Sequence, residues 1–270
     1  FRMIIDCSQL KCVALEHKNW LKSGIHCVSN NQKANGSDET EYIQLLTERN
    51  ESTASYHYST ALGTGLLPVL DTLKNLQSSG NCPIKIEGVF DGLIGRIFNT
   101  ISPPNEKLRS NEVSLSQACI EVFKDDYHSL FAYADELKRK LVILGREMGM
   151  EIEASSVEIE SLFSFDCPPM KECGSSMEES SKEATMAELL ANDDERFKQM
   201  NKEAWDSGLV LRYIGKIDAA TGKVSAGIER VPLNDSFAIL DGEAVCVKLI
   251  TMLSENSAII MTGPAGNSNS

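Results

Sequence analysis

The chain has few positive charges, no long apolar run and no metal-binding cysteine motif in its 270 residues. Lys and Arg number 26 against 39 Asp and Glu, which gives a net charge of −13. Because nucleic-acid phosphates are bound by clustered cations, this balance argues against a nucleic-acid partner. The apolar segments are short and interrupted, so none of them predicts a membrane span. The hydrophobic content of 42% still allows a substantial core, in one large domain or two small ones.

The eight cysteines are scattered, without a CxxC pair or a Cys/His cluster. A zinc site needs such paired spacings, so a structural zinc ion is not expected. Secreted disulfide-rich domains are shorter and denser in cysteine, which favours reduced thiols in an intracellular protein. The chain begins at Phe1 without an initiator Met, a basic region or a cleavage signal. This start indicates either a processed N-terminus or a fragment.

Strand-like and helix-like segments alternate over the first 65 residues. Met3–Asp6 and Ile25–Ser29 are short apolar runs typical of buried parallel strands, and Ser55–Thr60 is a third candidate. Helix-like stretches lie around Trp20 and over Tyr42–Leu46. This alternation predicts α/β organisation with a parallel, partly Rossmann-type sheet.

From Leu66 onward the pattern changes to longer helices and alternating strands. Leucines at helical spacing predict a helix to about Ser78, and a longer helix is expected over Leu130–Met148. A charged helix is expected at 187–205, after a Ser-, Glu- and Pro-rich surface stretch. The strand candidates are 84–90, 209–217, 224–231, 244–252 and 258–261. The second part is therefore predicted to be an α+β domain with an antiparallel sheet.

Five segments, in order and at compatible spacing, carry a resemblance to a known family. They are WLKSGIH with NQKAN (20–26, 31–35), GTGL with PVL (63–66, 68–70), IEGVFDG with IFN (86–92, 97–99), RKLVILGRE (139–147) and VLRYIGKID (210–218). They resemble segments of the homoserine dehydrogenases, and the resemblance extends from about Ile4 to Gly266. That family interconverts L-homoserine and L-aspartate 4-semialdehyde with NAD or NADP, in threonine and methionine biosynthesis.

The resemblance implies three parts of the chain. Residues 1–65 match the second half of an NAD(P)-binding domain, 66–262 a substrate-binding and dimerisation domain, and 263–270 a truncated tail. The family's GxGxxG, where backbone groups and a helix N-terminus hold the pyrophosphate, does not occur in this sequence. We therefore expect no turnover from the 270-residue chain by itself. The resemblance also implies a homodimer, homoserine as a small-molecule substrate, and a cytoplasmic location, or a plastid in a plant.

The resemblance assigns the catalytic role to Lys140. Hydride transfer to an aldehyde needs a group that protonates the developing alkoxide, and an ammonium also stabilises the oxyanion. Glu136, one helical turn earlier on the same face, and Asp125 match two substrate-binding carboxylates. Taken alone, a Glu–Lys pair at this spacing is better explained by a surface salt bridge. The surrounding RKLVILGRE sequence is what favours the functional role.

The family's other active-site lysine, in its NKKA loop, is replaced by Gln32. An amide supplies no proton near neutral pH, so we expect this change to reduce activity strongly. Lys33 follows and is kept as a second candidate catalytic lysine, although a shift of one residue changes the direction of a side chain. By resemblance, Ser8, Gln32 and Gly266 match positions at the cofactor.

The resemblance also implies a monovalent cation, Na⁺, beside the GTGL turn. The family binds it chiefly by backbone oxygens, so the identity of the side chains matters little. The matching positions are Ser59, Leu62, Thr64 and Leu66. Ser59 stands where a carboxylate usually lies, and one extra leucine follows the turn. Metal analysis of the purified protein tests this expectation.

Two functions are compatible with the sequence. One is a homoserine dehydrogenase, and the other is a degenerate homologue that acts as a structural or regulatory subunit. Gln32, the divergent loop around Asp125 and the missing GxGxxG favour the second, while the family resemblance favours the first. A different semialdehyde dehydrogenase would need a cofactor domain that this sequence does not show. His26 and His57, in predicted strands, are interpreted as packed or hydrogen-bonded rather than catalytic.

Overall fold

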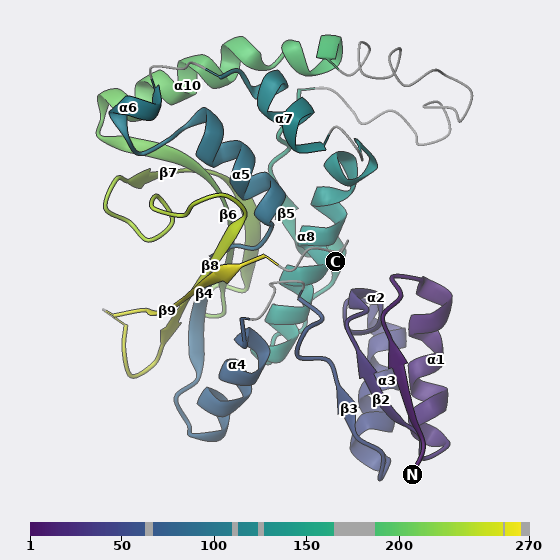
Figure 1. Cartoon of the computed structure of the whole chain (residues 1–270). Coiled ribbons are helices and arrows are strands. Elements are labelled where there is room, and N and C mark those ends of the chain that lie inside the picture. Colours follow the sequence, from purple (N-terminus) through teal and green to yellow (C-terminus); the bar gives the residue numbers. More distant parts are fainter. Residues whose placement is uncertain (63–66, 110–112, 124–126, 165–186, 256, 266–270) are drawn as a thin grey trace, which may run out of the picture.

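The first strands of the chain form a small parallel sheet in the order β1-β2-β3. The structure is a computed structural model, and it describes residues 1–62, 67–109, 113–123, 127–164, 187–255 and 257–265. Three helices accompany the small sheet and form the lower right part of Figure 1. The strands are β1 (Met3–Asp6), β2 (His26–Ser29) and β3 (Tyr56–His57), and the helices are α1 (Lys11–Lys22), α2 (Gln32–Asn35) and α3 (Glu39–Glu51). Because parallel strands need a crossover connection, the alternation in the sequence correctly predicts this lobe.

A six-stranded sheet lies in the rest of the chain, in the order β5-β7-β6-β4-β8-β9. Its strands are β4 (Pro83–Val89), β5 (Glu158–Ile159), β6 (Leu209–Asp218), β7 (Lys223–Pro232), β8 (Ala244–Thr251) and β9 (Ile259–Pro264). All neighbours are antiparallel except β5 and β7. The expected antiparallel sheet is therefore present, and the parallel strand β5 makes it mixed. The two sheets confirm the predicted α/β and α+β classes.

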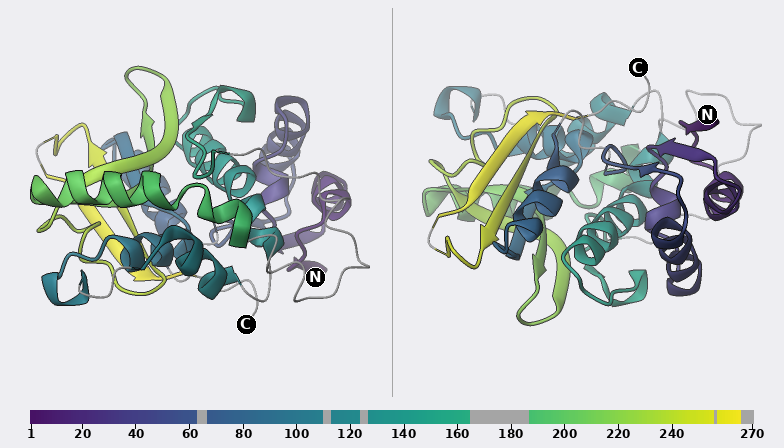
Figure 2. Two further views of the ribbon diagram at one scale, coloured as in Figure 1. Left: turned by 90° about the horizontal axis from the view of Figure 1, so that it is seen from above. Right: turned by 90° about the horizontal axis from the view of Figure 1, so that it is seen from below.

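Helices cover one face of this mixed sheet. Those of the second part are α4 (Val69–Ser78), α5 (Gly92–Ile101), α6 (Glu106–Arg109), α7 (Leu115–Phe123), α8 (Tyr127–Glu147) and α10 (Asp194–Asp206), with a 3₁₀ turn, η1 (Ala154–Ser156). The helices α5, α8 and α10 all contact β6, and Phe98, Leu141 and Phe197 bring them into one core cluster. Figure 2 shows these elements from above and from below. Buried leucines on α8, such as Leu137, Leu141 and Leu144, join the main core. None of the helices in the described ranges is long and apolar enough to cross a membrane.

A buried arginine on β6 links the end of α5 to the segment that follows β7. Arg212 on β6 is 1% exposed, and burial lowers the pKa of its guanidinium to about 10. It donates hydrogen bonds to the carbonyl oxygens of Ser102 (2.9 Å) and Phe98 (3.4 Å), at the end of α5. It also donates to those of Phe237 (2.9 Å) and Ala238 (2.6 Å) in the segment that follows β7. The Phe98 carbonyl also accepts from the amide of Ser102, whereas the carbonyl of Ser102 itself lies beyond the last turn of α5, where Arg212 supplies a donor.

The helix α8 connects the two lobes, and Figure 1 shows it between them. Near its end, Arg146 donates hydrogen bonds of 2.9 Å to the carbonyl oxygens of Asn35 and Ser37. The next residue, Glu147, accepts a 2.6 Å hydrogen bond from the hydroxyl of Tyr58. Both contacts reach across to the small parallel lobe. The same helix also carries Lys140, so it sets the position of that lysine relative to the small lobe.

Candidate functional site

The predicted catalytic lysine is buried in the middle of α8. Lys140 is 5% exposed, and its ammonium donates a 2.9 Å hydrogen bond to the carbonyl oxygen of Phe90. Among the described residues, no carboxylate forms an ion pair with it. A buried ammonium without a counter-ion is unfavourable in a purely structural setting. Such a group is suited to a negative charge that develops on a bound molecule.

The predicted substrate carboxylates can be placed only in part. Glu136 is partly exposed, one turn before Lys140 on α8. The spacing alone also allowed a salt bridge between the two side chains, but the structure shows none within the described residues. Asp125 lies outside the described residues. The assignment of both carboxylates to the substrate therefore stays a prediction.

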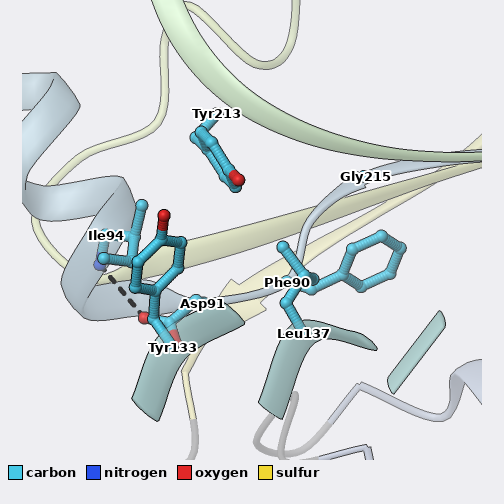
Figure 3. Close-up of a pocket in the computed structure, with 7 residues that line it drawn as sticks. All are labelled: Phe90, Asp91, Ile94, Tyr133, Leu137, Tyr213 and Gly215. Atoms are coloured by element: carbon cyan, nitrogen blue, oxygen red, sulfur yellow. Dashed lines mark hydrogen bonds between the residues drawn. The ribbon is translucent and has the colours of Figure 1, made fainter. Parts of the chain in front are cut away.

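A small cavity lies beside the carbonyl that holds Lys140 (Figure 3). Its volume of about 10 Å³ is room for roughly one water molecule, and not for an amino acid. The rings of Tyr133 and Tyr213 stand edge to face with centroids 5.9 Å apart. Their hydroxyl groups are engaged elsewhere, since Tyr133 accepts from the Leu162 amide and Tyr213 donates to the Glu160 carbonyl. The cavity is consequently a packing feature of the wall behind Lys140.

The NQKAN segment packs against the helix that carries Lys140. Asn31 caps α2, because its side chain accepts a 3.1 Å hydrogen bond from the amide of Lys33. A Cβ atom on Gly36 would lie 3.2 Å from the Cβ of Arg139, the neighbour of Lys140. The structure thus brings the segment of Gln32 next to the helix of Lys140. Lys33 itself lines a small cavity on the side of α1 and α3, with Leu15, Lys18 and Glu41 among its neighbours.

A buried hydrogen-bond chain at the end of β1 was not predicted from the sequence. The carboxylate of Asp6 accepts hydrogen bonds from the amide (2.8 Å) and hydroxyl (2.6 Å) of Ser8, and from the side chain of Asn31 (3.0 Å). His17, which is fully buried, lies 2.8 Å from it through Nε2. On its other side the Nδ1 atom of His17 lies 3.0 Å from the hydroxyl of Tyr56. Ser8, a predicted cofactor residue, is therefore held by a chain of buried polar groups.

The protonation states of this chain follow from its surroundings. Burial alone would raise the pKa of Asp6, but hydrogen bonds from Ser8, Asn31 and His17 outweigh it, and the pKa is lowered. Burial lowers the pKa of His17, and Asp6 offsets this only in part. His17 is therefore neutral near pH 7, with Nε2–H donating to Asp6 and Nδ1 accepting from the hydroxyl of Tyr56. No motif in the sequence around His17 marks this residue, so its role in the hydrogen-bond chain is seen only in the structure.

We expect His17 to make the stability of the protein depend on pH. Because the pKa of His17 is lower in the folded chain than its ordinary value of 6.5, its contribution is present above pH 6.5. It is lost as the pH falls through the lowered value. Urea unfolding between pH 8 and pH 4.5 should show this loss, and His17→Gln should reduce the slope. The exposed His57 is the matched control, and an equal reduction in His57→Gln would contradict the assignment.

The remaining predicted positions concern the cation and the end of the chain. Ser59 donates a 2.6 Å hydrogen bond to Asp71, and Leu62 is fully buried. Thr64, Leu66 and Gly266 lie outside the described residues, and so does the predicted boundary at 65 and 66. Over the described part of the chain, no group of three His, Cys, Asp or Glu residues could hold a metal ion. A site made of backbone oxygens is a separate matter, and it stays a prediction.

Ala265, the last described residue, lies against Gly92 at the start of α5. A Cβ atom on Gly92 would come within 2.5 Å of the Cβ of Ala265, and the amide of Ala265 donates to the carbonyl of Glu243 (3.3 Å). Ser8, from β1, follows the carboxyl end of a parallel strand. In open parallel sheets, ligands bind beyond this edge. The assignment of Ser8 to the cofactor stays a prediction.

Comparison with known proteins connects this arrangement to one family. The chain is 30% identical over 275 residues to the homoserine dehydrogenase of Saccharomyces cerevisiae, covering 98% of this chain and 70% of the yeast protein. It is 28% identical over 263 residues to the bifunctional aspartokinase/homoserine dehydrogenase 2 of Zea mays, covering 97% of this chain. A hyperthermophilic archaeal homoserine dehydrogenase in complex with NADPH has the same fold, with a TM-score of 0.60 at 15% identity, covering 98% of this chain and 66% of the archaeal one. No protein-family model matches the chain.

These relatives are members of an oxidoreductase family of amino-acid biosynthesis. It belongs to the homoserine dehydrogenase family. The chain spans only 27% of the length of the maize relative. The activity, substrates and assembly of a whole enzyme are therefore matters of proposal.

Proposed function

We propose that this chain carries the substrate half of a homoserine dehydrogenase, which interconverts L-homoserine and L-aspartate 4-semialdehyde with NADP or NAD. Threonine and methionine synthesis would use the product. The observation that carries the proposal is the buried ammonium of Lys140, which donates to one backbone carbonyl and pairs with no carboxylate in the described ranges. The NADPH complex of the archaeal relative supports the choice of cofactor.

The residues of the chain divide the chemistry between them. The cofactor supplies the hydride when it is bound. The ammonium of Lys140 stabilises the carbonyl oxygen as negative charge develops and then protonates it, which completes the alcohol. Glu136, and Asp125 by resemblance, hold the ammonium group of the amino acid. Ser8 faces the nicotinamide side and is fixed there by Asp6.

The proposal is tested first by binding, which needs no cofactor. L-homoserine should bind the purified chain in titration calorimetry and should slow the reaction of Lys140 with an amine reagent, followed by peptide mass spectrometry. The reactivity of Lys138, on the same helix and partly exposed, should not change and serves as the control. Absence of both homoserine binding and protection of Lys140 would refute the assignment of the site.

Turnover tests the effect of Gln32. Oxidation of NADPH by L-aspartate 4-semialdehyde is measured in a chimera that carries a GxGxxG segment of the family before Phe1, because no turnover is expected from the 270-residue chain by itself. With Gln32 in place, the chimera is expected to turn over slowly. Gln32→Lys should raise the rate by about tenfold to a hundredfold, because an ammonium restores a positive charge at the site. Gln9→Lys, which adds the same charge near the edge of the small sheet, is the control. An unchanged rate in Gln32→Lys would mean that position 32 does not face the reacting group.

The second candidate function is a catalytically degenerate subunit, and the observation that favours it is Gln32 with Lys33 directed toward α1 and α3. Such a subunit would fold and assemble but would bind homoserine weakly or not at all. The binding experiment therefore separates the two functions before any turnover is measured.

A homodimer is proposed as the assembly. The edge strand β9 supports it, since its backbone has no partner on the outer side in the described sheet, and Ile260 on it is 50% exposed. Sedimentation equilibrium should give about twice the chain mass of 29.7 kDa. Ile260→Lys should shift the equilibrium toward the monomer, whereas Ile43→Lys, a half-exposed residue of the small lobe, should not. A monomer at all concentrations would refute the proposal.

A further inference from the structure

Two glycines face each other on neighbouring strands behind Lys140. Gly88 on β4 pairs with Gly215 on β6. Neither is among the glycines with positive φ, so the backbone conformation does not require glycine at either position. The space next to both is taken by one ring. A Cβ atom on Gly88 would lie 2.6 Å from Cζ of Phe90, and one on Gly215 would lie 3.0 Å from Cδ2 and Cε2 of the same ring.

The ring of Phe90 therefore lies flat on the sheet, in the space that side chains at 88 and 215 would otherwise fill. Phe90 is 2% exposed. The residues on both sides of it are also fixed. Val89 ends β4 in register with Cys246, and Asp91 caps α5 by accepting 3.0 Å hydrogen bonds from the amides of Leu93 and Ile94. Figure 3 shows Phe90 and Asp91 between the sheet and the start of that helix.

The carbonyl of Phe90 is left free by this arrangement to serve the lysine. It lies beyond the last residue pair of β4 and accepts the 2.9 Å hydrogen bond from Lys140. The glycine at 215 also lets α8 approach closely, since its missing Cβ would lie 3.0 Å from Cδ2 of Leu141. The packing of the Phe90 ring on the two glycines thus fixes both the Phe90 carbonyl and α8, the helix that carries Lys140.

We propose that Phe90 is a positioning residue for Lys140, and that glycine is required at 88 and 215 because any side chain there would displace the ring of Phe90. The inference rests on the proposed function of Lys140. A carbonyl dipole directs the ammonium without neutralising it, whereas a carboxylate partner would hold the proton and weaken its transfer. The Phe90 carbonyl accepts from one N–H of the ammonium, and under this proposal a substrate oxygen accepts from another.

The test replaces each glycine by alanine and follows Lys140 directly. Protein labelled with ¹³C and ¹⁵N in lysine gives a side-chain NMR signal for Lys140, assigned by its loss in Lys140→Met. Gly88→Ala and Gly215→Ala should shift that signal and lower kcat by about tenfold to a hundredfold, with KM changed little, because the reacting proton is misplaced. Turnover is measured in the Gln32→Lys form of the chimera with the GxGxxG segment, and the NMR signal in the 270-residue chain. Gly145→Ala is the control for Gly215→Ala, because its Cβ would lie 3.1 Å from Ile152, close to the 3.0 Å between the Gly215 Cβ and Phe90, without touching Phe90.

A double substitution keeps the test valid if the glycine variants fold poorly. Phe90→Leu removes the ring, so it should shift the Lys140 signal by itself, and adding Gly88→Ala should produce little further change in the signal or in kcat. Additive effects, or a Lys140 signal that stays in place in Gly88→Ala, Gly215→Ala and Phe90→Leu, would overturn the inference. Failure of the proposed function has a different signature, which is unchanged turnover in Lys140→Met.

Discussion

Arg212→Met is expected to lower the free energy of unfolding by about 3–5 kcal/mol, one of the largest losses available to a single substitution in this chain. The guanidinium is fully buried and serves carbonyl oxygens of two separate segments, at the end of α5 and at Phe237 and Ala238. Methionine fills much of the volume but donates nothing, so several buried acceptors lose their partners. Each such loss amounts to about 1–3 kcal/mol. Urea unfolding, followed by tryptophan fluorescence, measures the effect.

The matched control for this substitution is Arg230→Met on the neighbouring strand. Arg230 pairs with Glu203 at 2.8 Å, but its side chain is 45% exposed, so its loss should change stability by less than about 1 kcal/mol. Arg212→Lys should lie between the two, because an ammonium carries the charge but cannot reach acceptors in four directions. If Arg212→Met unfolds within 1 kcal/mol of the unsubstituted chain, the bonding pattern described for Arg212 does not govern stability.

Lys140→Met should lower kcat/KM at least about a thousandfold in the Gln32→Lys form of the chimera with the GxGxxG segment, where turnover is expected to be highest. The substitution removes both the oxyanion donor and the proton source, and each contributes a factor of roughly a hundred or more. The same substitution should leave the stability of the folded chain unchanged or higher. Lys140 makes no ion pair among the described residues, and replacing such a buried charge by an apolar side chain of similar size is neutral or stabilising, so the unfolding midpoint should not fall appreciably.

Lys138→Met, on the same helix but partly exposed, provides the comparison for this experiment. It should leave both kcat/KM and stability close to those of the parent. Turnover is followed as the disappearance of NADPH with L-aspartate 4-semialdehyde. A Lys140→Met protein that keeps a tenth of the parental rate would exclude Lys140 as the proton donor.

The sequence predicts the elements whose stabilising contacts are local. The long helix expected at Leu130–Met148 is found at Tyr127–Glu147, and the strands 209–217 and 224–231 are found within a residue or two of their expected ends. Helix α7 was not predicted, because the groups that begin it come from far away. The amide and hydroxyl of Ser116 donate to Asp194, at 2.8 and 2.6 Å. Strand β5 was missed for a related reason, since its two residues are defined only by pairing with β7.

The candidate site divides in the same way. Lys140 and Glu136 are recognisable because a continuous helical segment carries the resemblance. Periodicity gives no information on what surrounds Lys140, because the acceptor is a backbone oxygen fifty positions earlier. The expected strand Ser55–Thr60 has only two paired residues, and the important group in it is the hydroxyl of Tyr56, which meets His17 across 39 positions. Buried polar chains of this kind follow from the fold and not from any motif.

The contacts of Arg146 with the small lobe have a consequence for how the two parts of the chain accept change. Its hydrogen bonds end on the backbone oxygens of Asn35 and Ser37, so this junction does not depend on which side chains those positions carry. In a saturation mutagenesis screen, substitutions at 37 should be widely accepted, whereas position 146 should accept almost nothing but arginine. The Arg146 part of the junction is thus encoded on one side only, whereas the hydrogen bond between Tyr58 and Glu147 needs a side chain from each lobe.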